Sequence, residues 1–304
     1  MSPATARVGA SPHLVTLLAV VIFSANYVVG RGVYEDVPPV MLGFVRWAGA
    51  AVLLAPFVWQ RFAKDWPLLR ASWPVIVAAG ILMPLFGATA GYFGLTMTTA
   101  TNGGILQVAL PMLAALLAWI VIGETLAPRQ LVGIAVSVAG VLYLVAQGDP
   151  TRIAAFTFNP GDIVLVFCNV ALALYAVLVR KLPRAIDPLA LLFAICAVGG
   201  LVHLPLLVVE LAMGQVVQFT ERAAVGLVFV ALFPSIVAIL CWNTGIKQLG
   251  PSVSSVYMYL VPVFTAALGA LLLGERIAHF HVIGAVLIIA GVTLTTLSAR
   301  PRLA

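Results

Sequence analysis

The sequence predicts an all-α integral membrane protein, in which ten transmembrane helices form two inverted five-helix repeats around a central cavity. Hydrophobic residues make up 63% of the 304 positions and charged residues only 9%, and the mean hydropathy is +1.14. Apolar runs of about 20 residues, the length that a helix needs to cross a bilayer, recur along the chain. A two-helix stretch also occurs twice. The first two observations predict the membrane class, and the third predicts the repeats.

The apolar runs give the expected position of each helix. We place the helices at 13–33, 39–59, 73–97, 101–122, 128–146, 161–180, 187–209, 223–247, 251–273 and 279–298. The first run is followed by many others, so we interpret it as a membrane helix rather than a signal peptide. The three cysteines, Cys168, Cys196 and Cys241, fall inside predicted helices. The sequence therefore predicts no disulfide framework, no metal site and no cofactor.

The repeated stretch begins at Leu110 and again at Val261, about 150 residues later. The matching positions are Pro111 with Pro262, Gly123-Glu124 with Gly274-Glu275, Gly133 with Gly284, and Gly140 with Gly291. The predicted organisation is an N-terminal tail (1–12), a first repeat (13–146), a connection (147–160), a second repeat (161–298) and a C-terminal tail (299–304). Because five helices is an odd number, the second repeat enters the membrane from the opposite side.

The distribution of basic residues predicts the topology. Most Lys and Arg residues fall on one side of the predicted helices, and the positive-inside rule places this side and both termini in the cytoplasm. This distribution explains the net charge of +6 without a nucleic-acid partner. We therefore expect a multi-pass protein of the bacterial inner membrane, with the lipid bilayer as its surroundings.

Four prolines fall in the middle of predicted helices and form two symmetry-related pairs: Pro84 with Pro234, and Pro111 with Pro262. A proline in a helix removes a backbone hydrogen bond and kinks the chain. Each kink can serve packing alone. Interrupted helices at matching positions are, however, a pointer to the binding site of a transporter, so we predict a lined cavity or a hinge there.

Glycine spacing predicts helix packing. Gly133 and Gly140, like Gly284 and Gly291, lie one heptad apart on helices with few polar groups, and we interpret these helices as peripheral supports. The third predicted helix carries a similar stripe of Gly80, Gly87, Gly91 and Gly94, for which tight packing is the preferred interpretation. Glu124 and Glu275 follow the fourth and ninth helices, and we expect each to form a structural elbow facing the N-terminus of the next helix.

This pattern resembles the EamA-type branch of the drug/metabolite transporter superfamily. The resemblance rests on a helix running from a proline to Gly-Glu, followed by a glycine-spaced helix, in both halves of the chain. Within the branch the chain is similar to the YddG-type amino acid exporters, whose substrates include aromatic amino acids. The resemblance implies a basket of helices one to four and six to nine around a central cavity, with the fifth and tenth outside.

Acidic residues are absent from the middle of every predicted helix. Proton-coupled carriers often place an acid there. The small multidrug resistance relatives carry an acid in their first helix, where this chain reads Ser24-Ala25-Asn26-Tyr27. We therefore favour facilitated export. Backbone carbonyls remain able to hold a cation, and proton-coupled antiport remains the alternative.

Arg46 is the strongly charged side chain placed well inside a predicted helix. A substrate carboxylate or backbone carbonyls are its natural partners in the membrane interior. The alternative is that the side chain extends to the membrane surface, since Arg46 lies only about 12 Å from the helix end at 1.5 Å per residue.

Other polar and aromatic side chains could line the cavity. The candidates are Asn26, Tyr27, Tyr92, Gln107, Asn169, Tyr175, Trp242, Asn243, Tyr257 and Tyr259. Amides and phenols can bind a zwitterion, and aromatic faces accept an apolar side chain. Interhelical hydrogen bonds and core packing are the alternatives for each. His203 has no second histidine nearby, so we predict neither a proton relay nor a metal ligand there.

A carrier that alternates access to a site between the halves is the leading functional prediction, with an amino acid or a similar small zwitterion as substrate. Export of another small polar metabolite or of a drug is the alternative. An intramembrane enzyme is disfavoured, because the sequence shows no HExxH motif, paired intramembrane aspartates or GxSxG elbow. A channel is disfavoured too, because no ring of like charges recurs. The sequence leaves the oligomeric state open.

Overall fold

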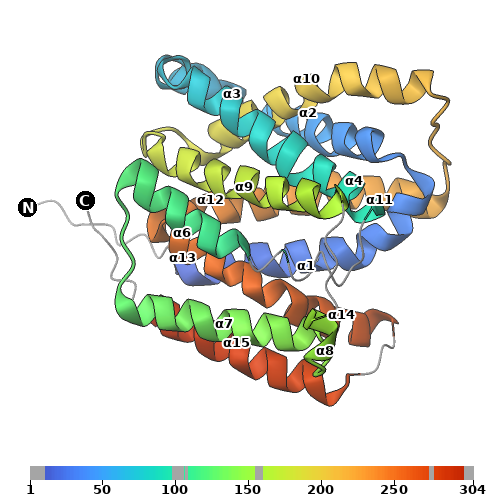
Figure 1. Ribbon diagram of the computed structural model, residues 1–304. Helices are drawn as coiled ribbons and strands as arrows, with labels where there is room; N and C mark the ends of the chain where they lie inside the picture. The colour runs from blue at the N-terminus through green and yellow to red at the C-terminus, as the bar shows by residue number, and fades with distance from the viewer. Residues whose placement is uncertain (1–10, 98–105, 107–108, 155–159, 274–276, 298–304) are drawn as a thin grey trace, which may run out of the picture.

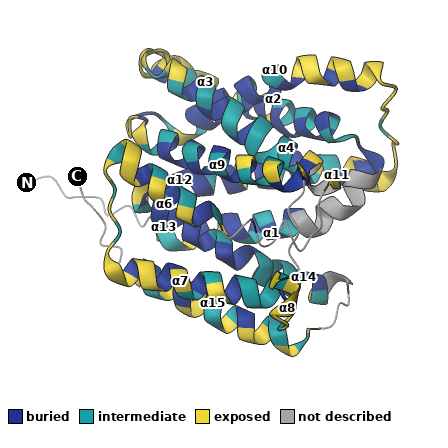
Figure 2. Ribbon diagram, viewed as in Figure 1, coloured by how far each residue is buried: buried dark blue, intermediate teal, exposed yellow. Residues whose placement is uncertain are grey.

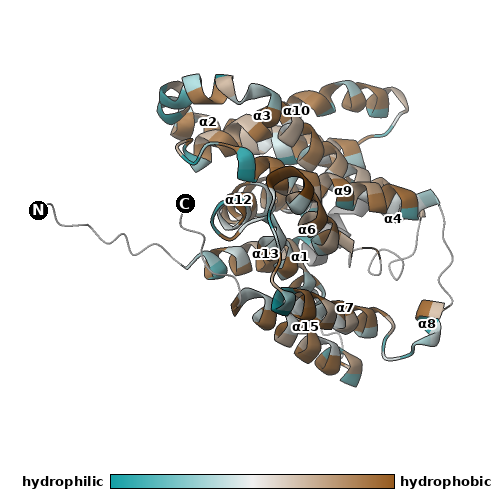
Figure 3. Cartoon of the chain, turned by 60° about the vertical axis from the view of Figure 1, so that its left-hand side comes forward, coloured by the Kyte–Doolittle hydropathy of each residue, from teal (hydrophilic) through white to brown (hydrophobic). Residues whose placement is uncertain are grey.

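The computed structural model describes residues 11–97, 106, 109–154, 160–273 and 277–297. Every regular element in these residues is a helix (Figure 1). Seven helices are long and apolar enough to cross a membrane, and three shorter apolar helices cover Pro12–Asn26, Trp73–Thr89 and Ala109–Ile122. Figure 3 shows apolar residues along the helices and more polar residues in the connections. The predicted all-helical membrane class is confirmed, while the count of ten spans and the inversion of the halves stay predictions.

The helices follow the predicted order closely. The first part of the chain contains α1 (Pro12–Asp36), α2 (Pro39–Ala71), α3 (Trp73–Ile81), the π-helical segment η1 (Leu82–Thr89), α4 (Ala90–Met97), α6 (Ala109–Ile122), α7 (Pro128–Val145) and α8 (Thr151–Ala154). The second part contains α9 (Pro160–Lys181), α10 (Pro188–Ala212), α11 (Glu221–Leu232), the π-helical segment η2 (Phe233–Val237), α12 (Ala238–Leu249), α13 (Pro251–Val256), the 3₁₀ segment η3 (Tyr257–Leu260), α14 (Val261–Leu273) and α15 (His279–Leu297).

Helix α2 is longer than predicted, because it continues past residue 59 to Ala71. The additional turns bury Asp65 and Leu69 and expose Arg61, and a connection was the wrong prediction for this stretch. At about 1.5 Å per residue, a helix of 33 residues exceeds the thickness of the hydrocarbon core. The helix is therefore longer than a span perpendicular to the bilayer requires.

Two of the four prolines lie in interrupted helices at matching positions. Pro84 lies in η1, between α3 and α4, and Pro234 lies in η2, between α11 and α12. Pro262 is the second residue of α14 and directly follows the 3₁₀ turn of η3. Pro111 lies near the start of α6, where residues 107 and 108 are outside the described part, so its kink stays a prediction.

Helices α7 and α15 pack side by side on one side of the bundle, away from α2 and α10 on the other side (Figures 1 and 3). A Cβ added to Gly133 would lie 2.7 Å from the backbone oxygen of Gly291, and one added to Gly291 would lie 2.5 Å from the oxygen of Gly133. An added Cβ would also lie 2.9 Å from the backbone nitrogen of Ile288 at Gly140, and 2.8 Å from Cβ of Leu144 at Gly284. The predicted glycine faces therefore form one antiparallel contact, and the outer faces of both helices are exposed (Figure 2).

The glycine stripe of the third predicted helix also mediates close packing, with one exception. Added Cβ atoms at Gly80, Gly87 and Gly94 would lie within 3 Å of Val198, Leu172 and Leu165 respectively. Gly91 has no atom within 4 Å of such a Cβ. Close packing is confirmed at three of the positions, and Gly91 stands apart because it faces open space.

Candidate functional site

The interruption at Pro234 is built from three groups on two helices. Proline has no N–H, so the carbonyl of Val230, four residues earlier, loses its helical donor. The hydroxyl of Ser235 donates a hydrogen bond to this carbonyl at 2.6 Å. The same hydroxyl accepts a hydrogen bond from Nε of Arg46 on α2 at 2.9 Å. Pro234 therefore interrupts the helix, and the hydroxyl of the next residue, Ser235, satisfies the carbonyl of Val230 that the proline leaves without a donor.

Arg46 lies inside the helix bundle. It is 4% exposed, and its guanidinium carbon lies 5.1 Å from the centre of the Trp47 ring. The side chain is buried among neighbouring helices, and its depth in the membrane stays a prediction. An arginine is expensive to bury in a membrane interior and is kept there by polar contacts. The hydrogen bond to Ser235 places its charge beside η2.

His203 makes a similar contact with the other interruption. Its Nδ1 lies 2.6 Å from the backbone oxygen of Gly199, and its Nε2 lies 2.8 Å from the hydroxyl oxygen of Thr89, the last residue of η1. A carbonyl oxygen can only accept, so Nδ1 carries a proton, and in the neutral ring Nε2 accepts from Thr89. His203 is fully buried and links α10 to η1. No role could be predicted for this residue, because its partner Thr89 lies 114 positions away in the sequence.

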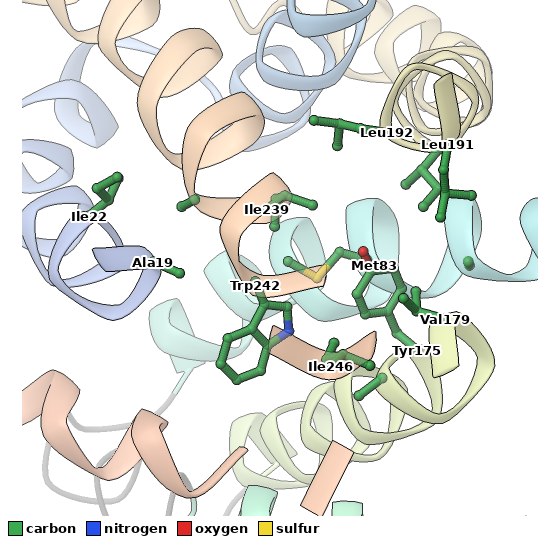
Figure 4. Packing of buried hydrophobic residues seen from close by; sticks show 14 of the residues in the cluster. Ala19, Ile22, Met83, Tyr175, Val179, Leu191, Leu192, Ile239, Trp242 and Ile246 are labelled. Carbon is green, nitrogen blue, oxygen red and sulfur yellow. The ribbon is translucent and has the colours of Figure 1, made fainter. Parts of the chain in front are cut away.

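Three predicted site residues, Tyr175, Trp242 and Asn243, are buried in the core, and Figure 4 shows the first two. The hydroxyl of Tyr175 donates to Oδ1 of Asn243 at 2.6 Å, joining α9 to α12. Trp242 packs edge-on against Phe23 of α1. Figure 4 shows Met83 of η1 between the rings of Trp242 and Tyr175, and these residues belong to one buried cluster. The side chains fill this part of the bundle by direct contact, so the predicted central cavity stays a prediction.

The remaining predicted residues are spread over the bundle. Oδ1 of Asn26 is buried without a hydrogen-bond partner among the described residues. Nδ2 of Asn169 donates to the backbone oxygen of Leu106, and the hydroxyl of Tyr257 lies 2.6 Å from Nδ1 of His13 at the start of α1. Tyr259 is 2% exposed. Gln107 lies outside the described residues, as do the side chains of Tyr27 and Tyr92.

The acidic residues of the described part lie in connections or within two turns of a helix end. Asp36, the last residue of α1, accepts hydrogen bonds from the hydroxyl of Thr220 at 2.8 Å and from Nε of Arg222 at 3.1 Å. The bond from Arg222, followed by that from Thr220, lowers the pKa of Asp36 below its ordinary value. This ion pair joins the end of α1 to the start of α11.

Glu124 lies beside the start of a helix that is distant in the sequence. Its carboxylate oxygens lie 2.9 Å from the position of an added Cβ on Gly250, the residue before α13. The backbone N–H of Ala127, the residue before α7, donates to the side chain of Gln130 at 2.8 Å. The expectation that Glu124 faces the start of α7 stays a prediction. Glu275 lies outside the described residues.

Comparison with known proteins identifies the family. The sequence pattern of the EamA-like transporter family matches residues 10–146 and again residues 159–297, which together cover most of the chain. The chain belongs to the EamA-like transporter family. It is a membrane transporter, and the family is one of carriers rather than of enzymes.

Several relatives of this EamA-like transporter align over most of its length. The uncharacterized transporter YyaM of Bacillus subtilis is 33% identical over 80% of this chain and 79% of its own. An uncharacterized transporter of Archaeoglobus fulgidus is 28% identical over 93% of this chain and 96% of its own. The S-adenosylmethionine uptake transporter of Rickettsia prowazekii is 26% identical over 62% of this chain and 61% of its own.

A solved crystal structure has the same fold as this EamA-like transporter. It superimposes with a TM-score of 0.78 at 21% sequence identity, over 96% of this chain and 98% of the other. A likeness at this identity extends to the fold alone. The chain is therefore an integral membrane transporter of known architecture, and its relatives leave the substrate to be proposed.

The hydrogen-bond partners of Arg46 and His203 could not be predicted from the sequence. Ser235 and Thr89 are small hydroxyl residues within apolar runs, and residue type alone does not identify them as partners of Arg46 and His203. A signal existed for Ser235, because it directly follows Pro234 and a hydroxyl at this place can bond the carbonyl that the proline frees. No comparable signal existed for Thr89, which lies five residues after Pro84.

Proposed function

We propose that this EamA-like transporter exports amino acids, aromatic ones included, across the bacterial inner membrane by facilitated alternating access. The observation that carries the proposal is the pair of π-helical interruptions at Pro84 and Pro234, one in each stretch that matches the family. Interrupted helices at matching positions support a gate that opens to either side of the membrane.

The side chains beside η2 and in the core support a zwitterionic substrate. Arg46 offers the charge that a substrate carboxylate needs, and Asn26 offers a buried amide oxygen that has no hydrogen-bond partner within the described part of the chain, suited to an ammonium group. Trp242 and Tyr175 supply aromatic surfaces for an apolar side chain. We assign the substrate to a site between these residues, which becomes accessible when the interrupted helices bend.

The position of the acidic residues supports facilitated transport. A proton-driven carrier commonly uses a carboxylate in the membrane interior, whereas the described acids of this chain lie near helix ends. Inner-membrane location is supported by a relative from Escherichia coli, the uncharacterized inner membrane transporter YedA, which is 26% identical over 91% of this chain. The charge distribution supports cytoplasmic termini, and the two family matches support an inverted ten-helix arrangement.

A second candidate function follows from the Rickettsia prowazekii relative, whose name gives S-adenosylmethionine uptake. This compound carries the same α-amino acid group, so a site built for an amino acid head could accept it. The two candidates differ in substrate size and in direction of flux. One assay that measures both directions separates them.

The test uses purified protein in liposomes with a panel of labelled amino acids and S-adenosylmethionine, with and without a proton gradient. Saturable flux of aromatic amino acids that follows their own gradient supports the proposal. Flux of S-adenosylmethionine alone would support the second candidate. No flux of any amino acid would refute the substrate, and flux that requires the proton gradient would refute the facilitated mechanism. Pro84→Ala and Pro234→Ala should each slow the flux, because the helices lose their flexible segments.

A further inference from the structure

Two helix pairs join the stretches that match the family. Helices α2 and α7 belong to residues 10–146, and their packing partners α10 and α15 belong to residues 159–297. The pair α2–α10 lies on one side of the bundle, and the pair α7–α15 lies on the other (Figures 1 and 3). The two halves of the transporter are therefore joined on two opposite sides.

Polar contacts fasten both ends of the α2–α10 pair. At the start of α2, the carboxylate of Glu210 from α10 accepts hydrogen bonds from the backbone N–H groups of Val40 and Met41, at 2.9 and 2.7 Å. These are free donors of a helix N-terminus, where a negative charge is favourable. Glu210 is 7% exposed, so this contact is shielded from solvent.

The other end has the reciprocal arrangement. The carboxylate of Asp65 near the end of α2 accepts a hydrogen bond from the backbone N–H of Asp187, the residue before α10, at 2.7 Å. Arg61 of α2 pairs with the Asp187 carboxylate at 3.3 Å. Each helix thus contributes an acid, near its own end, that binds the start of its partner.

The middle of the pair is equally close. An added Cβ on Gly200 of α10 would lie 2.9 Å from Cβ of Ala48 on α2. A Cβ on Gly43 of α2 would lie 2.7 Å from Nε2 of His203. Glycine at these positions lets the two backbones approach, as small residues do in membrane helix pairs. Separation of α2 from α10 would break contacts along their whole length.

Each of the two interrupted helices packs against this pair, as Gly80 does against Val198, and each also makes a side-chain hydrogen bond to it. Thr89 at the end of η1 bonds His203 of α10, and Ser235 in η2 bonds Arg46 of α2. Both contacts involve a hydroxyl within or at the end of a π-helical segment, where the regular ladder of backbone bonds is already disturbed. These hydrogen bonds are local, and the packing of α3 and α11 on the pair is less extensive than that of α2 on α10.

We propose that Arg46 and His203 are positioning residues that hold the two interrupted helices against the α2–α10 pair, and that opening breaks these two contacts while α2–α10 remains intact. The inference rests on the alternating access of the proposed function. It excludes a rigid rocking of one half against the other, because such a motion would separate α2 from α10. The gate opens instead by bending of the helices that contain η1 and η2.

Hydrogen–deuterium exchange in detergent or nanodiscs tests the two contacts without a substrate. In Thr89→Val, exchange of the amides in residues 82–89 should rise about tenfold, since a net hydrogen bond is lost, while residues 233–237 keep the wild-type rate. Ser235→Ala should give the reverse pattern, and so each segment is the internal control for the other. Thr89→Ser and Ser235→Thr retain a hydroxyl and should keep exchange near the wild-type rate. Equal changes in both segments in either variant would overturn the assignment.

Chemical crosslinking tests the intact pair. The double variant Arg61→Cys/Asp187→Cys is joined by a short bis-methanethiosulfonate reagent, with the uncrosslinked variant and reagent-treated wild type, which has three native cysteines, as controls. Exchange at residues 82–89 and 233–237 should stay within about twofold of the uncrosslinked variant. A crosslink that suppresses exchange in both segments would show that α2 and α10 must separate, and would overturn the inference whatever the substrate is.

A flux arm separates this inference from the proposed function. With a transported amino acid in liposomes, the Arg61→Cys/Asp187→Cys crosslink should leave flux unchanged, whereas a Thr89→Cys/His203→Cys crosslink should abolish it. If no amino acid is transported by wild type, the proposed substrate fails, and the exchange pattern still decides the inference. If flux stops with the first crosslink, the inference fails and the substrate assignment stands.

Discussion

Gly133→Ala should destabilise the protein by weakening the contact between α7 and α15. The added Cβ would lie 2.7 Å from the backbone oxygen of Gly291 and 2.7 Å from the backbone nitrogen of Thr295. These are backbone atoms of α15, so the clash is relieved only when the two helices move apart. Overpacking of this kind costs about 1–3 kcal/mol, and it outweighs the gain of about 0.5–1 kcal/mol from replacing glycine in a helix.

Gly91→Ala is the matched control for this prediction. An added Cβ at Gly91 of α4 meets no atom within 4 Å, so only the helix gain of about 0.5–1 kcal/mol remains. The free energies of unfolding of the two variants should therefore differ by about 2 kcal/mol, obtained by combining the two ranges. The measurement is reversible unfolding in a fixed detergent with increasing SDS, followed by circular dichroism.

Two results would refute this reasoning. A Gly133→Ala variant at least as stable as wild type would mean that α7 and α15 do not rely on the close approach. The double variant Gly133→Ala/Gly291→Ala provides a second check, because both added methyl groups act on one contact. Its loss of stability should be smaller than the sum of the single losses, and strict additivity would contradict a shared contact.

Three further predictions concern the polar groups. Asp36→Asn should lower the melting temperature at pH 7; because the folded-state pKa of Asp36 is lowered by Arg222, this deficit should shrink as the pH falls below about 4, as thermal melts across pH would show. Tyr175→Phe should lower the free energy of unfolding by about 1 kcal/mol, since it removes the hydrogen bond to Asn243. In SDS titrations, Asn243→Leu should cost less stability in the Tyr175→Phe background than in the wild type. Arg46→Gln should reduce flux in liposomes at least tenfold, because a bond to a charged group contributes about 1.5–3 kcal/mol, and unchanged flux would contradict a role in transport.

The helices could be predicted because hydrophobicity along the chain is a local property. The predicted helix at 279–298 and the observed α15 (His279–Leu297) agree almost residue for residue. The prediction was wrong for the end of α2, where charged residues indicated a connection and the structure continues the helix to Ala71. Charge in a membrane protein marks the edge of the apolar layer, and a helix is free to cross that edge.

The glycines and prolines predicted helix packing and helix interruptions, because both residue types act through the backbone. The repeat at Gly133 and Gly284 predicted supporting helices, and the structure adds that α7 and α15 contact each other. Pro84 and Pro234 predicted interruptions that the structure shows as π-helical segments. A proline removes the hydrogen-bond donor of the carbonyl four residues before it, so its local effect can be predicted from the sequence without knowledge of the fold.

The polar contacts could not be predicted, because each joins residues that are distant in the sequence. Arg46 was recognised as unusual, but its partner Ser235 lies 189 positions away. Glu124 illustrates the same limit: its position after a helix was read correctly, and the helix start that it faces belongs to another part of the chain. A side chain's chemistry is set by its type, whereas its partner is set by the fold.

The pairing of α2 with α10 and of α7 with α15 also has a consequence for how the polypeptide is made. Neither matched stretch holds both members of either pair, so each would expose bare glycine faces if it were produced alone. Genes for two separate fragments, ending at Ala154 and starting at Pro160, should complement each other when expressed in the same cell, while either fragment alone is degraded. The covalent link between the halves then ensures their equal supply during synthesis, and the folded assembly is held by the helix pairs themselves.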